Sequence, residues 1–305
     1  MPVERANTDL LSPVTIIHSS GAKAVVHPFG ATVTSFQTSA GRELLFVSSL
    51  AKLDGSKAIR GGIPLAFPQF GQPDKSMPQH GFLRCNTWKV GNEFEAENGA
   101  SCCEFTLSLA DVVKARGGKW DFSGDLDCEV TLTVKVEAEK MTNVLTMKNT
   151  GETEFDFQAL FHTYYKIEGA KALEKEACNV GGLTGYSVED KVTGEDYVLN
   201  DDEPVFVEGE VDRIYSNPSK PDLEVIIGTG EGIKTGLKAS ASVDGTKTSV
   251  SAVVWNPFIE KAKALGDFAD EQYHEMICVE PGILKNVPVL GAGKEAVFEQ
   301  VITAM

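Results

Sequence analysis

The sequence predicts an all-β protein, built as a large antiparallel β-sandwich with a few short helices. Segments in which apolar and polar residues alternate recur along the chain, and clusters of Gly, Pro, Asn and Asp separate them. Helical patterns are few and short, so the chain lacks the alternation of strands and helices that builds a parallel sheet. Glycine supplies 29 of 305 residues, which favours many turns.

The clearest strand signal is EVTLTVKVEAE at 129–139, where four apolar residues from Val130 to Val136 share one face. The segment FDFQALFHTYYKI at 155–167 continues this alternation and places His162 on the face away from the aromatic stripe. Further strands are predicted at Lys23–Val26, Thr32–Gln37, Glu43–Val47, Glu104–Leu109, Met141–Lys148, Val205–Val207, Leu223–Ile227, Val250–Trp255, Met276–Val279 and Ala296–Ile302.

Two segments have helical patterns, LAKLDG at Leu50–Gly55 and a longer one at Ile259–Met276. The chain contains no low-complexity segment, no linker and no repeat of fixed period. We therefore expect residues 1–305 to form a single domain of the sandwich type.

The charge balance argues against a nucleic-acid partner. The formal net charge is −16 and the sequence pI is near 4.8, and such a surface repels phosphate backbones. A small phosphorylated ligand is still compatible with this charge. Salt screens the diffuse surface charge beyond ~8 Å, whereas two converging arginines act at contact distance.

The sequence carries no sign of export or of a membrane span, because no apolar run has the length of a signal peptide core or of a span. The six cysteines form no C-x-x-C pair, and no two histidines have metal-ligand spacing. We expect a cytoplasmic monomer with reduced thiols, no metal site, no cofactor and no membrane partner. Motifs for nucleotide binding and for serine hydrolases do not occur either.

One turn-rich segment, IRGGIPLAFPQFGQPDKSMPQHGFLRCNTW at 59–88, gathers unusual polar residues. Arg60 precedes two glycines that would allow backbone and guanidinium to approach a ligand, and Arg84 follows Gln79 and His80. The planar forks of two arginines suit phosphate oxygens. Alternatively, each arginine pairs with one of the many surface carboxylates.

Three other residues are candidates for chemistry. His162 has a ring suited to proton transfer near neutral pH, although a structural histidine fits the pattern equally well. Glu280 shares a strand face with Met276 and Cys278, before a proline that is expected to end the strand; a cleft base or an edge-strand glutamate would fit. Asp212 is a weak candidate in a segment that resembles a loop.

An aromatic group at Trp255, Pro257 and Phe258 would suit a wall on which a sugar stacks. Such a group is more often ordinary core, so the sequence leaves both interpretations open.

Several motifs together resemble one known family. RGGIPLAFPQFG, PQHGFLR, LFHTYYKI, VDRIYSN, VVWNPFIEKAKALGDF and MICVEPG are similar to segments of the hexose-6-phosphate mutarotases, also called glucose-6-phosphate 1-epimerases. The likeness extends from about Leu44 to Gly282. These proteins belong to the aldose 1-epimerase and galactose mutarotase group, and the resemblance implies their fold, a large antiparallel sandwich of two extended sheets.

The resemblance also implies residue roles. Glu280 matches the family's general base and His162 its general acid. Phe258 stands where the family commonly has tryptophan, which changes at most the shape of the sugar wall. The positions that match substrate-binding residues, with the arginines at the phosphate and the histidine at a ring hydroxyl or oxygen, are Arg60, Gln79, His80, Arg84 and Asp212.

The implied reaction interconverts the α and β anomers of a hexose 6-phosphate, with glucose 6-phosphate as the expected substrate. Glu280 would take the proton of the C1 hydroxyl while His162 protonates the ring oxygen, so that the ring opens and closes again on the other face. Neither metal nor nucleotide is required. Two alternatives are a mutarotase for unphosphorylated aldoses and a non-catalytic protein that binds or senses carbohydrate.

Overall fold

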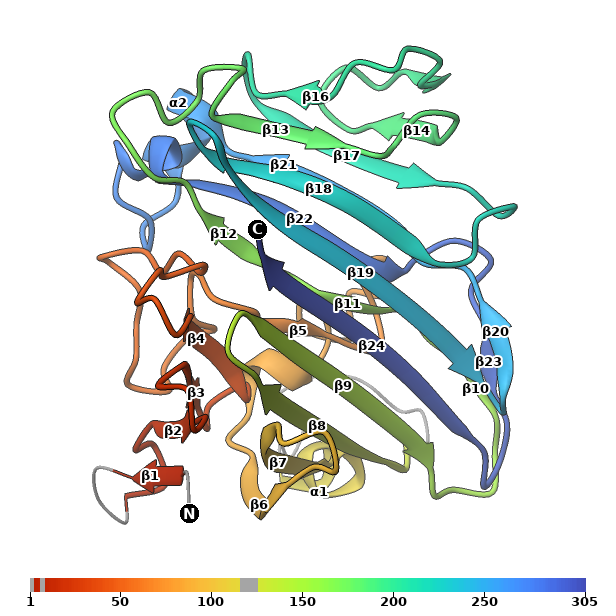
Figure 1. The fold of residues 1–305 in the computed structure, drawn as a ribbon. Coiled ribbons are helices and arrows are strands. Elements are labelled where there is room, and N and C mark those ends of the chain that lie inside the picture. Colours follow the sequence, from red (N-terminus) through yellow and green to blue (C-terminus); the bar gives the residue numbers. More distant parts are fainter. Residues whose placement is uncertain (1–2, 6–8, 116–125) are drawn as a thin grey trace.

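The computed structural model describes residues 3–5, 9–115 and 126–305, and it confirms the all-β class. Two large antiparallel sheets dominate the fold, and in Figure 1 the long strands of one cross in front of those of the other. None of the helices in these three ranges is long and apolar enough to cross a membrane.

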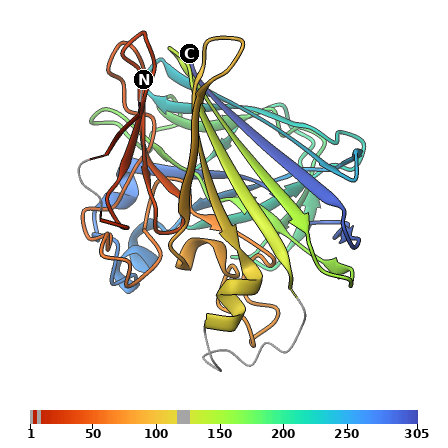
Figure 2. The same cartoon turned by 90° about the horizontal axis from the view of Figure 1, so that it is seen from below.

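The larger sheet has ten strands. Figure 2, seen from below, shows several of them fanning out side by side. Eight long or central strands and two short ones make up this sheet, in the order β16 (Val205–Phe206), β13 (Cys178–Gly181), β18 (Leu223–Gly230), β19 (Ile233–Val243), β24 (Glu295–Ala304), β9 (Lys140–Asn149), β8 (Cys128–Val136), β7 (Ser101–Ser108) and β6 (Lys89–Glu95), with β20 (Thr246–Thr248) paired to β19.

The second sheet has eight strands and positions most of the candidate residues. Its order is β15 (Asp196–Val198), β14 (Ser187–Asp190), β17 (Val211–Ser216), β21 (Ser251–Asn256), β22 (Met276–Ile283), β11 (Ala159–Phe161) and β5 (Leu65–Ala66), with β12 (Tyr164–Lys166) also paired to β22.

Smaller elements complete the described fold. A four-stranded sheet contains β1 (Val3–Arg5), β2 (Val14–Ile17), β3 (Lys23–His27) and β4 (Thr32–Gln37), and a two-stranded sheet pairs β10 (Phe155–Asp156) with β23 (Val289–Leu290). The helices are α1 (Leu109–Ala115) and α2 (Phe258–Ala264), with 3-10 turns η1 (Leu83–Cys85) and η2 (Gln272–Glu275).

The main core lies between the inner faces of the two large sheets. The predicted apolar face of β8 is buried there, with Val130 and Val134 fully covered. Phe161 of the smaller sheet meets Phe298 of the larger one with ring centroids 4.7 Å apart. A second cluster covers the other face of the eight-stranded sheet and includes Cys278. The central strands β21 and β22 are therefore buried on both faces.

Two predicted elements are wrong. Residues 43–47 form isolated bridges with three different partners in place of a strand, so no continuous ladder develops. Residues 50–55 form turns and bends and no helix. Leu50 and Leu53 are 47% and 52% exposed, so no core contact stabilises a short helix there.

Two other segments differ from the prediction in detail. The helical pattern at 259–276 yields α2 and η2 only, with an irregular connection between them. The predicted strand at 155–167 is broken into β10, β11 and β12, because its parts pair with different partners. The alternation itself persists, since Phe161 joins the main core and Tyr164 the second cluster.

Candidate active site

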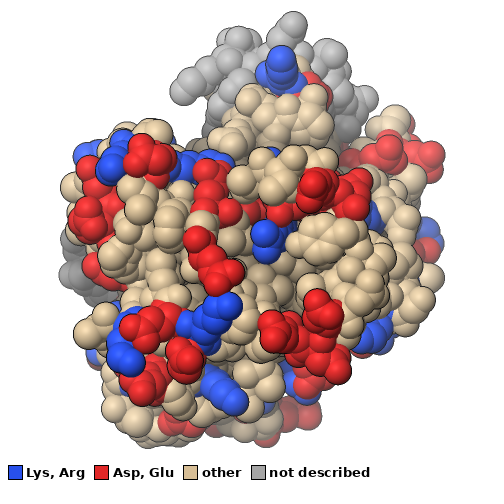
Figure 3. All heavy atoms as spheres, turned by 90° about the horizontal axis from the view of Figure 1, so that it is seen from above, with Lys and Arg blue, Asp and Glu red and all other residues tan. Residues whose placement is uncertain are grey.

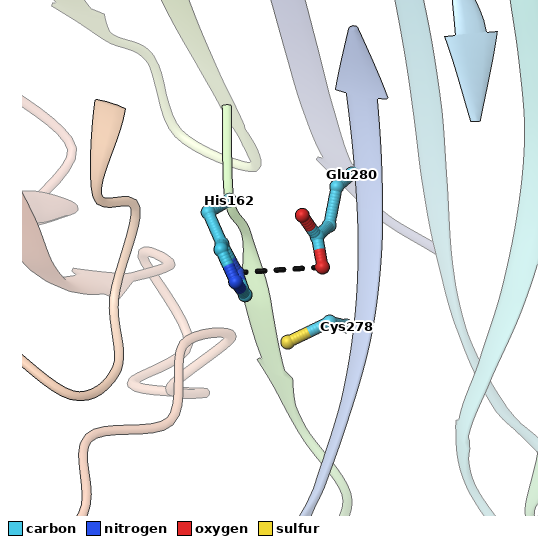
Figure 4. A group of neighbouring side chains, drawn as sticks. All are labelled: His162, Cys278 and Glu280. Atoms are coloured by element: carbon cyan, nitrogen blue, oxygen red, sulfur yellow. Dashed lines mark ion pairs between the residues drawn. The ribbon is translucent and has the colours of Figure 1, made fainter. Parts of the chain in front are cut away.

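The ladders around β22 place His162 opposite Glu280. The pairing of β11 with β22 and the pairing of β12 with β22 keep one common register, so position 162, in the gap between β11 and β12, falls opposite position 280. Opposed residues of antiparallel strands have Cβ atoms ~4.5–5.5 Å apart. Nδ1 of His162 lies 3.4 Å from Oε1 of Glu280, as Figure 4 shows.

The local structure of β22 differs from the prediction at one point. Glu280 does share a face with Met276 and Cys278, opposite the core-facing Ile277, as expected. Pro281, however, lies inside the strand and does not end it. Pro281 has no N–H to donate, and the ladder to β11 and β12 is interrupted at this level, so the strand continues past it.

The pair is almost enclosed. The side chains of Glu280 and His162 are 2% and 12% exposed. Their contact is not aligned as a hydrogen bond, and within the described ranges Nδ1 of His162 and Oε2 of Glu280 have no hydrogen-bond partner. Buried polar atoms without a partner are rare and costly. These two belong to side chains that line a cavity, where a ligand can supply the partner.

That cavity brings together all seven candidate residues from the sequence. Its volume is about 260 Å³, slightly below the ~300–1,000 Å³ typical of ligand pockets. A larger but more open hollow of about 360 Å³ lies over β14, β15 and β17 and contains none of these residues. The predicted residues lining the cavity are Arg60, Gln79, His80, Arg84, His162, Asp212 and Glu280.

Two glycines of the segment 59–88 are required for backbone packing, which differs from the role expected for the glycines after Arg60. A Cβ at Gly62 would lie 2.1 Å from the carbonyl oxygen of Val33, and one at Gly81 would lie 1.9 Å from that of Phe67. Both glycines also have positive φ, 65° and 71°. Their small size therefore allows close packing of backbone against backbone beneath the cavity wall, and not an approach of the backbone to a ligand.

Arg60 is held from two sides. Its Nε donates to Oδ1 of Asp267 over 3.1 Å, and its Nη1 donates to the hydroxyl of Tyr164 over 3.2 Å. Tyr164 in turn stacks on His162, with centroids 4.8 Å apart and ring planes within 8°. Asp267 also forms an ion pair with Lys57, whose Nζ lies 2.8 Å from Oδ2. Tyr164 thus connects the guanidinium of Arg60, in the cavity wall, to the imidazole of His162.

Arg84 retains more unused hydrogen-bonding capacity. Its Nη2 donates to the backbone carbonyl of Gln79 over 3.1 Å, whereas its buried Nε has no partner among the residues described. Gln79 itself is exposed, so its side chain lies at the mouth of the cavity it lines.

His80 is fixed in one tautomer. Its Nδ1 accepts a hydrogen bond from the backbone N–H of Gly71 over 3.2 Å. A neutral imidazole that accepts at Nδ1 carries its proton on Nε2. Burial, and next the charge of Arg84, lower the pKa of His80 well below its usual value. His80 therefore retains an Nε2–H donor, as contact with a sugar oxygen requires.

Asp212 lies in the middle of a sheet, which corrects the loop-like assignment. It belongs to β17 and pairs in register with Trp255 of β21. Its Oδ2 is 3.8 Å from Nζ of Lys261, which is closer to Glu210, at 2.7 Å. Burial raises the pKa of Asp212 above its ordinary value. Two lysines, Lys191 and Lys261, oppose this effect, and the Asp212 side chain lines the cavity.

Two basic residues that the sequence did not reveal as candidates, Lys191 and Lys261, also line the cavity. Lys191 follows β14, and its Nζ lies 4.8 Å above the ring of Phe70, another lining residue. Of the predicted aromatic group, Trp255 lines the cavity and meets the edge of His162 at 6.1 Å. Phe258 instead packs against Tyr273 at 5.3 Å. A lone lysine in a turn has no sequence pattern that would have identified it.

Burial controls the proton affinity of the catalytic candidates. It raises the pKa of Glu280 well above its ordinary value, and Asp212 adds to this, while two basic side chains oppose it. Burial also lowers the pKa of His162 well below its ordinary value, and two arginines lower it further. An ionised Glu280 is then a stronger base and a protonated His162 a stronger acid than the free side chains.

A buried polar chain supports the His162 segment from the opposite sheet. Nε2 of Gln300, on β24, donates to Oγ1 of Thr163 over 2.6 Å. Nδ2 of Asn143, on β9, donates to Oε1 of Gln300 over 3.4 Å. All three side chains are in fully buried residues. Because buried polar groups are costly unless paired, this chain fixes the break between β11 and β12.

A third side chain lies beside the catalytic candidates. His162, Cys278 and Glu280 each offer one ligand atom, and these three atoms lie within 4.8 Å of one another, as Figure 4 shows. The spacing of cysteines and histidines along the chain predicted no metal-binding group. This grouping arises from residues of different strands.

Comparisons with known proteins cover nearly the whole chain. The family profile described as aldose 1-epimerase matches residues 12–303. A protein of Cenchrus ciliaris is 30% identical over 287 residues, which are 93% of this chain and 82% of the relative. A protein of Escherichia coli is 25% identical over 279 residues, 91% of this chain and 85% of the relative. Both carry the provisional name glucose-6-phosphate 1-epimerase.

The fold matches solved structures as well. The crystal structure of a protein from Salmonella typhimurium, provisionally described as a mutarotase, superposes with a TM-score of 0.78 at 21% identity, over 99% of this chain and 94% of the other. This likeness supports the galactose mutarotase-like sandwich. Because the profile covers almost all of the sequence and a full-length relative reaches 30% identity, the chain belongs to the aldose 1-epimerase family.

Proposed function

We propose that the protein interconverts the α and β anomers of a hexose 6-phosphate, with glucose 6-phosphate as the preferred substrate. The observation that supports this proposal is that the His162–Glu280 pair and several basic side chains line the same cavity. An acid and a base suffice for mutarotation, and a cluster of cations is the feature that a neutral sugar would not need.

The acid–base pair performs ring opening. Glu280, as the carboxylate, removes the proton of the C1 hydroxyl, and His162, as the imidazolium, donates a proton to the ring oxygen. The bond between C1 and the ring oxygen breaks, and the free aldehyde forms. Rotation about C1–C2 presents the other carbonyl face, and the reverse transfers close the ring. The pair thus ends each turnover with the protons it started with.

The phosphate is assigned to the basic part of the cavity. Arg84 has an unpartnered Nε, and Lys191 makes no ion pair within the described ranges, so both can bind a dianion. Figure 3 shows acidic and basic side chains interspersed, with acidic ones more extensive, on the face seen from above. A cluster of converging cations overcomes such a diffuse field because its contacts are direct.

Phosphate binding would also prepare His162 for its role. The charges of Arg84 and Arg60 help to depress the pKa of His162. A phosphate dianion that neutralises these guanidinium groups removes part of this depression and favours the imidazolium. Binding of the phosphate, which is remote from C1, would in this way favour the protonated His162 that the reaction needs.

The sugar ring would lie between the pair and the aromatic wall. Trp255 offers an apolar surface to the ring, while His80 can donate from Nε2 and Asp212 can accept from hydroxyl groups. Each positioned acid or base typically contributes ~10²- to 10⁴-fold. Mutarotation is already spontaneous in water, so this pair and correct positioning provide sufficient catalysis.

Saturation-transfer NMR tests the proposal by measuring the rate of α/β exchange with and without the protein. We expect acceleration with glucose 6-phosphate and much less with glucose. Equal acceleration of both sugars would support a mutarotase for unphosphorylated aldoses. Binding of glucose 6-phosphate by calorimetry, without any acceleration over buffer, would support a non-catalytic carbohydrate-binding protein.

A further inference from the structure

We propose that His162, Cys278 and Glu280 form a binding site for a thiophilic divalent cation such as Zn²⁺, and that the bound ion blocks the cavity. The ring nitrogen, thiol sulfur and carboxylate oxygen lie within 4.8 Å of one another. Ligand atoms of a tetrahedral zinc site are about 3.5 Å apart, given bonds of about 2.0–2.3 Å. Rotations that shift these atoms by about 1 Å would complete the site.

The strands hold the three ligands in position. Cys278 and Glu280 are alternate residues on one face of β22, and His162 faces them from the gap between β11 and β12. Two of the candidate ligand groups also contain the buried atoms without partners, Nδ1 of His162 and Oε2 of Glu280. This second observation marks a place where a ligand can satisfy polar groups that the protein does not.

The ligand types select the class of ion. Zinc accepts nitrogen, sulfur and oxygen ligands in tetrahedral sites, and thiolate favours Zn²⁺ and similar soft ions over Mg²⁺ and Ca²⁺. On binding, the S–H bond of Cys278 breaks, its proton leaves to solvent, and a sulfur–zinc bond forms. Glu280 binds as the carboxylate. Water would supply a fourth ligand, because two of the three side chains, His162 and Glu280, line the cavity.

The charges of the cavity limit the affinity. Thiolate and carboxylate together neutralise both charges of the ion, but Arg60, Arg84 and Lys191 all line the same cavity and oppose a cation. We therefore expect reversible binding, weaker than that of a structural zinc site. The proposed reaction needs His162 and Glu280 without a ligand, so the ion would inhibit it, and only this consequence depends on the proposed function.

Calorimetric titration of the chelator-treated full chain with Zn²⁺ tests binding directly. We expect one site that Cys278→Ala weakens by more than the about 10- to 100-fold typical of losing an outer-shell partner. The control Cys85→Ala removes the cysteine that is partly exposed, and it should leave the site intact. Equal Zn²⁺ affinity in Cys278→Ala and the unsubstituted chain, or no binding at all, would overturn the proposal.

Titration with Co²⁺ provides a measurement that does not need the variant to fold. A thiolate ligand produces a charge-transfer absorption, which we expect in the unsubstituted chain and in Cys85→Ala. Its absence despite metal binding would overturn the role of Cys278. In an activity assay, Zn²⁺ should inhibit anomer exchange and a chelator should restore it. If the protein binds Zn²⁺ but does not catalyse anomer exchange, that result contradicts the proposed function and not the metal site.

Discussion

The floor and the wall of the cavity are built in different ways. The floor is the eight-stranded sheet, where ladder registers place Glu280 opposite His162 and Asp212 beside Trp255. The wall consists of the segment 59–88 and its neighbours, where no long ladder exists and individual side-chain contacts fix each group.

This difference separates the proposed chemistry from the proposed substrate choice. The acid–base pair depends on strand pairing, which is cooperative and hard to displace by one surface substitution. The basic groups depend on single contacts, such as that between Arg60 and Asp267, which can change without unfolding the sheet. Substitutions in the floor should therefore affect the rate, and substitutions in the wall the preference for a phosphorylated sugar.

The largest effect is expected for Glu280→Gln in the floor. The amide keeps the shape of the side chain but cannot accept the C1 proton, so anomer exchange should fall by ~10²- to 10⁴-fold. Calorimetry should still detect binding of glucose 6-phosphate, because the basic groups are unchanged. Loss of rate and binding together would argue that Glu280 holds the substrate and is not the base.

Arg84→Gln tests the wall. Hydrogen bonds to charged groups are worth about 1.5–3 kcal/mol, so kcat/KM for glucose 6-phosphate should fall about 10- to 100-fold. The slow rate with glucose should change much less, and only because the charge of Arg84 also helps to lower the pKa of His162. Arg84→Lys is the matched control, since it keeps the charge and should recover part of the loss. A similar decrease with both sugars would contradict the separation of wall and floor.

Gln300→Leu tests support of the floor from the opposite sheet. The substitution leaves the buried hydroxyl of Thr163 without its 2.6 Å partner, and we expect a loss of about 1–3 kcal/mol in the free energy of unfolding. Anomer exchange should slow while KM changes little. The double variant Gln300→Leu with Thr163→Val should recover part of the stability but not the rate, because Asn143 still lacks its acceptor. Recovery of the rate as well would show that these hydrogen bonds have only a structural role.

The smallest effect is expected for the pH dependence at Asp267. Although burial by itself raises the pKa of this carboxyl, the hydrogen bond from Lys57 and the charge of Arg60 outweigh it, and the net pKa lies below the ordinary value. The carboxylate therefore stabilises the fold above its unfolded-state pKa, ~3.9, and this contribution is lost as pH falls through the lower folded-state pKa.

Thermal unfolding of Asp267→Asn and of the unsubstituted chain, between pH 7 and pH 3, measures this contribution. The difference in midpoint should narrow toward the acid end. The variant should also raise KM for glucose 6-phosphate by less than about tenfold, since Arg60 retains Tyr164. A difference that widens as pH falls would contradict the sign of the pKa shift.

Much of the fold was predictable because the strands follow simple alternation. The apolar face of β8 and the two faces of β22 are where the pattern indicated. The prediction failed where local pattern and long-range pairing differ. Residues 43–47 look like a strand but meet three different partners, and Asp212 looks like part of a loop although β17 is central in its sheet.

The sequence predicted which residues belong to the candidate site, but not how their side chains lie relative to one another. Motifs identified seven of the residues that line the cavity, whereas the register that places His162 opposite Glu280 depends on strands far apart in the sequence. The same applies to Asp267, which is 207 residues from the Arg60 that it holds. Lys191 and Gln300 carry no local signal, because their importance comes only from what the fold brings next to them.

A crystal structure of Glu280→Gln with glucose 6-phosphate would test the central claim most directly, that one cavity holds the sugar between the acid–base pair and the phosphate-binding groups. We predict the anomeric oxygen within hydrogen-bonding distance of residue 280, the ring oxygen next to His162, and the phosphate in contact with Arg84. A phosphate directed away from the arginines, or a sugar bound outside this cavity, would contradict the account.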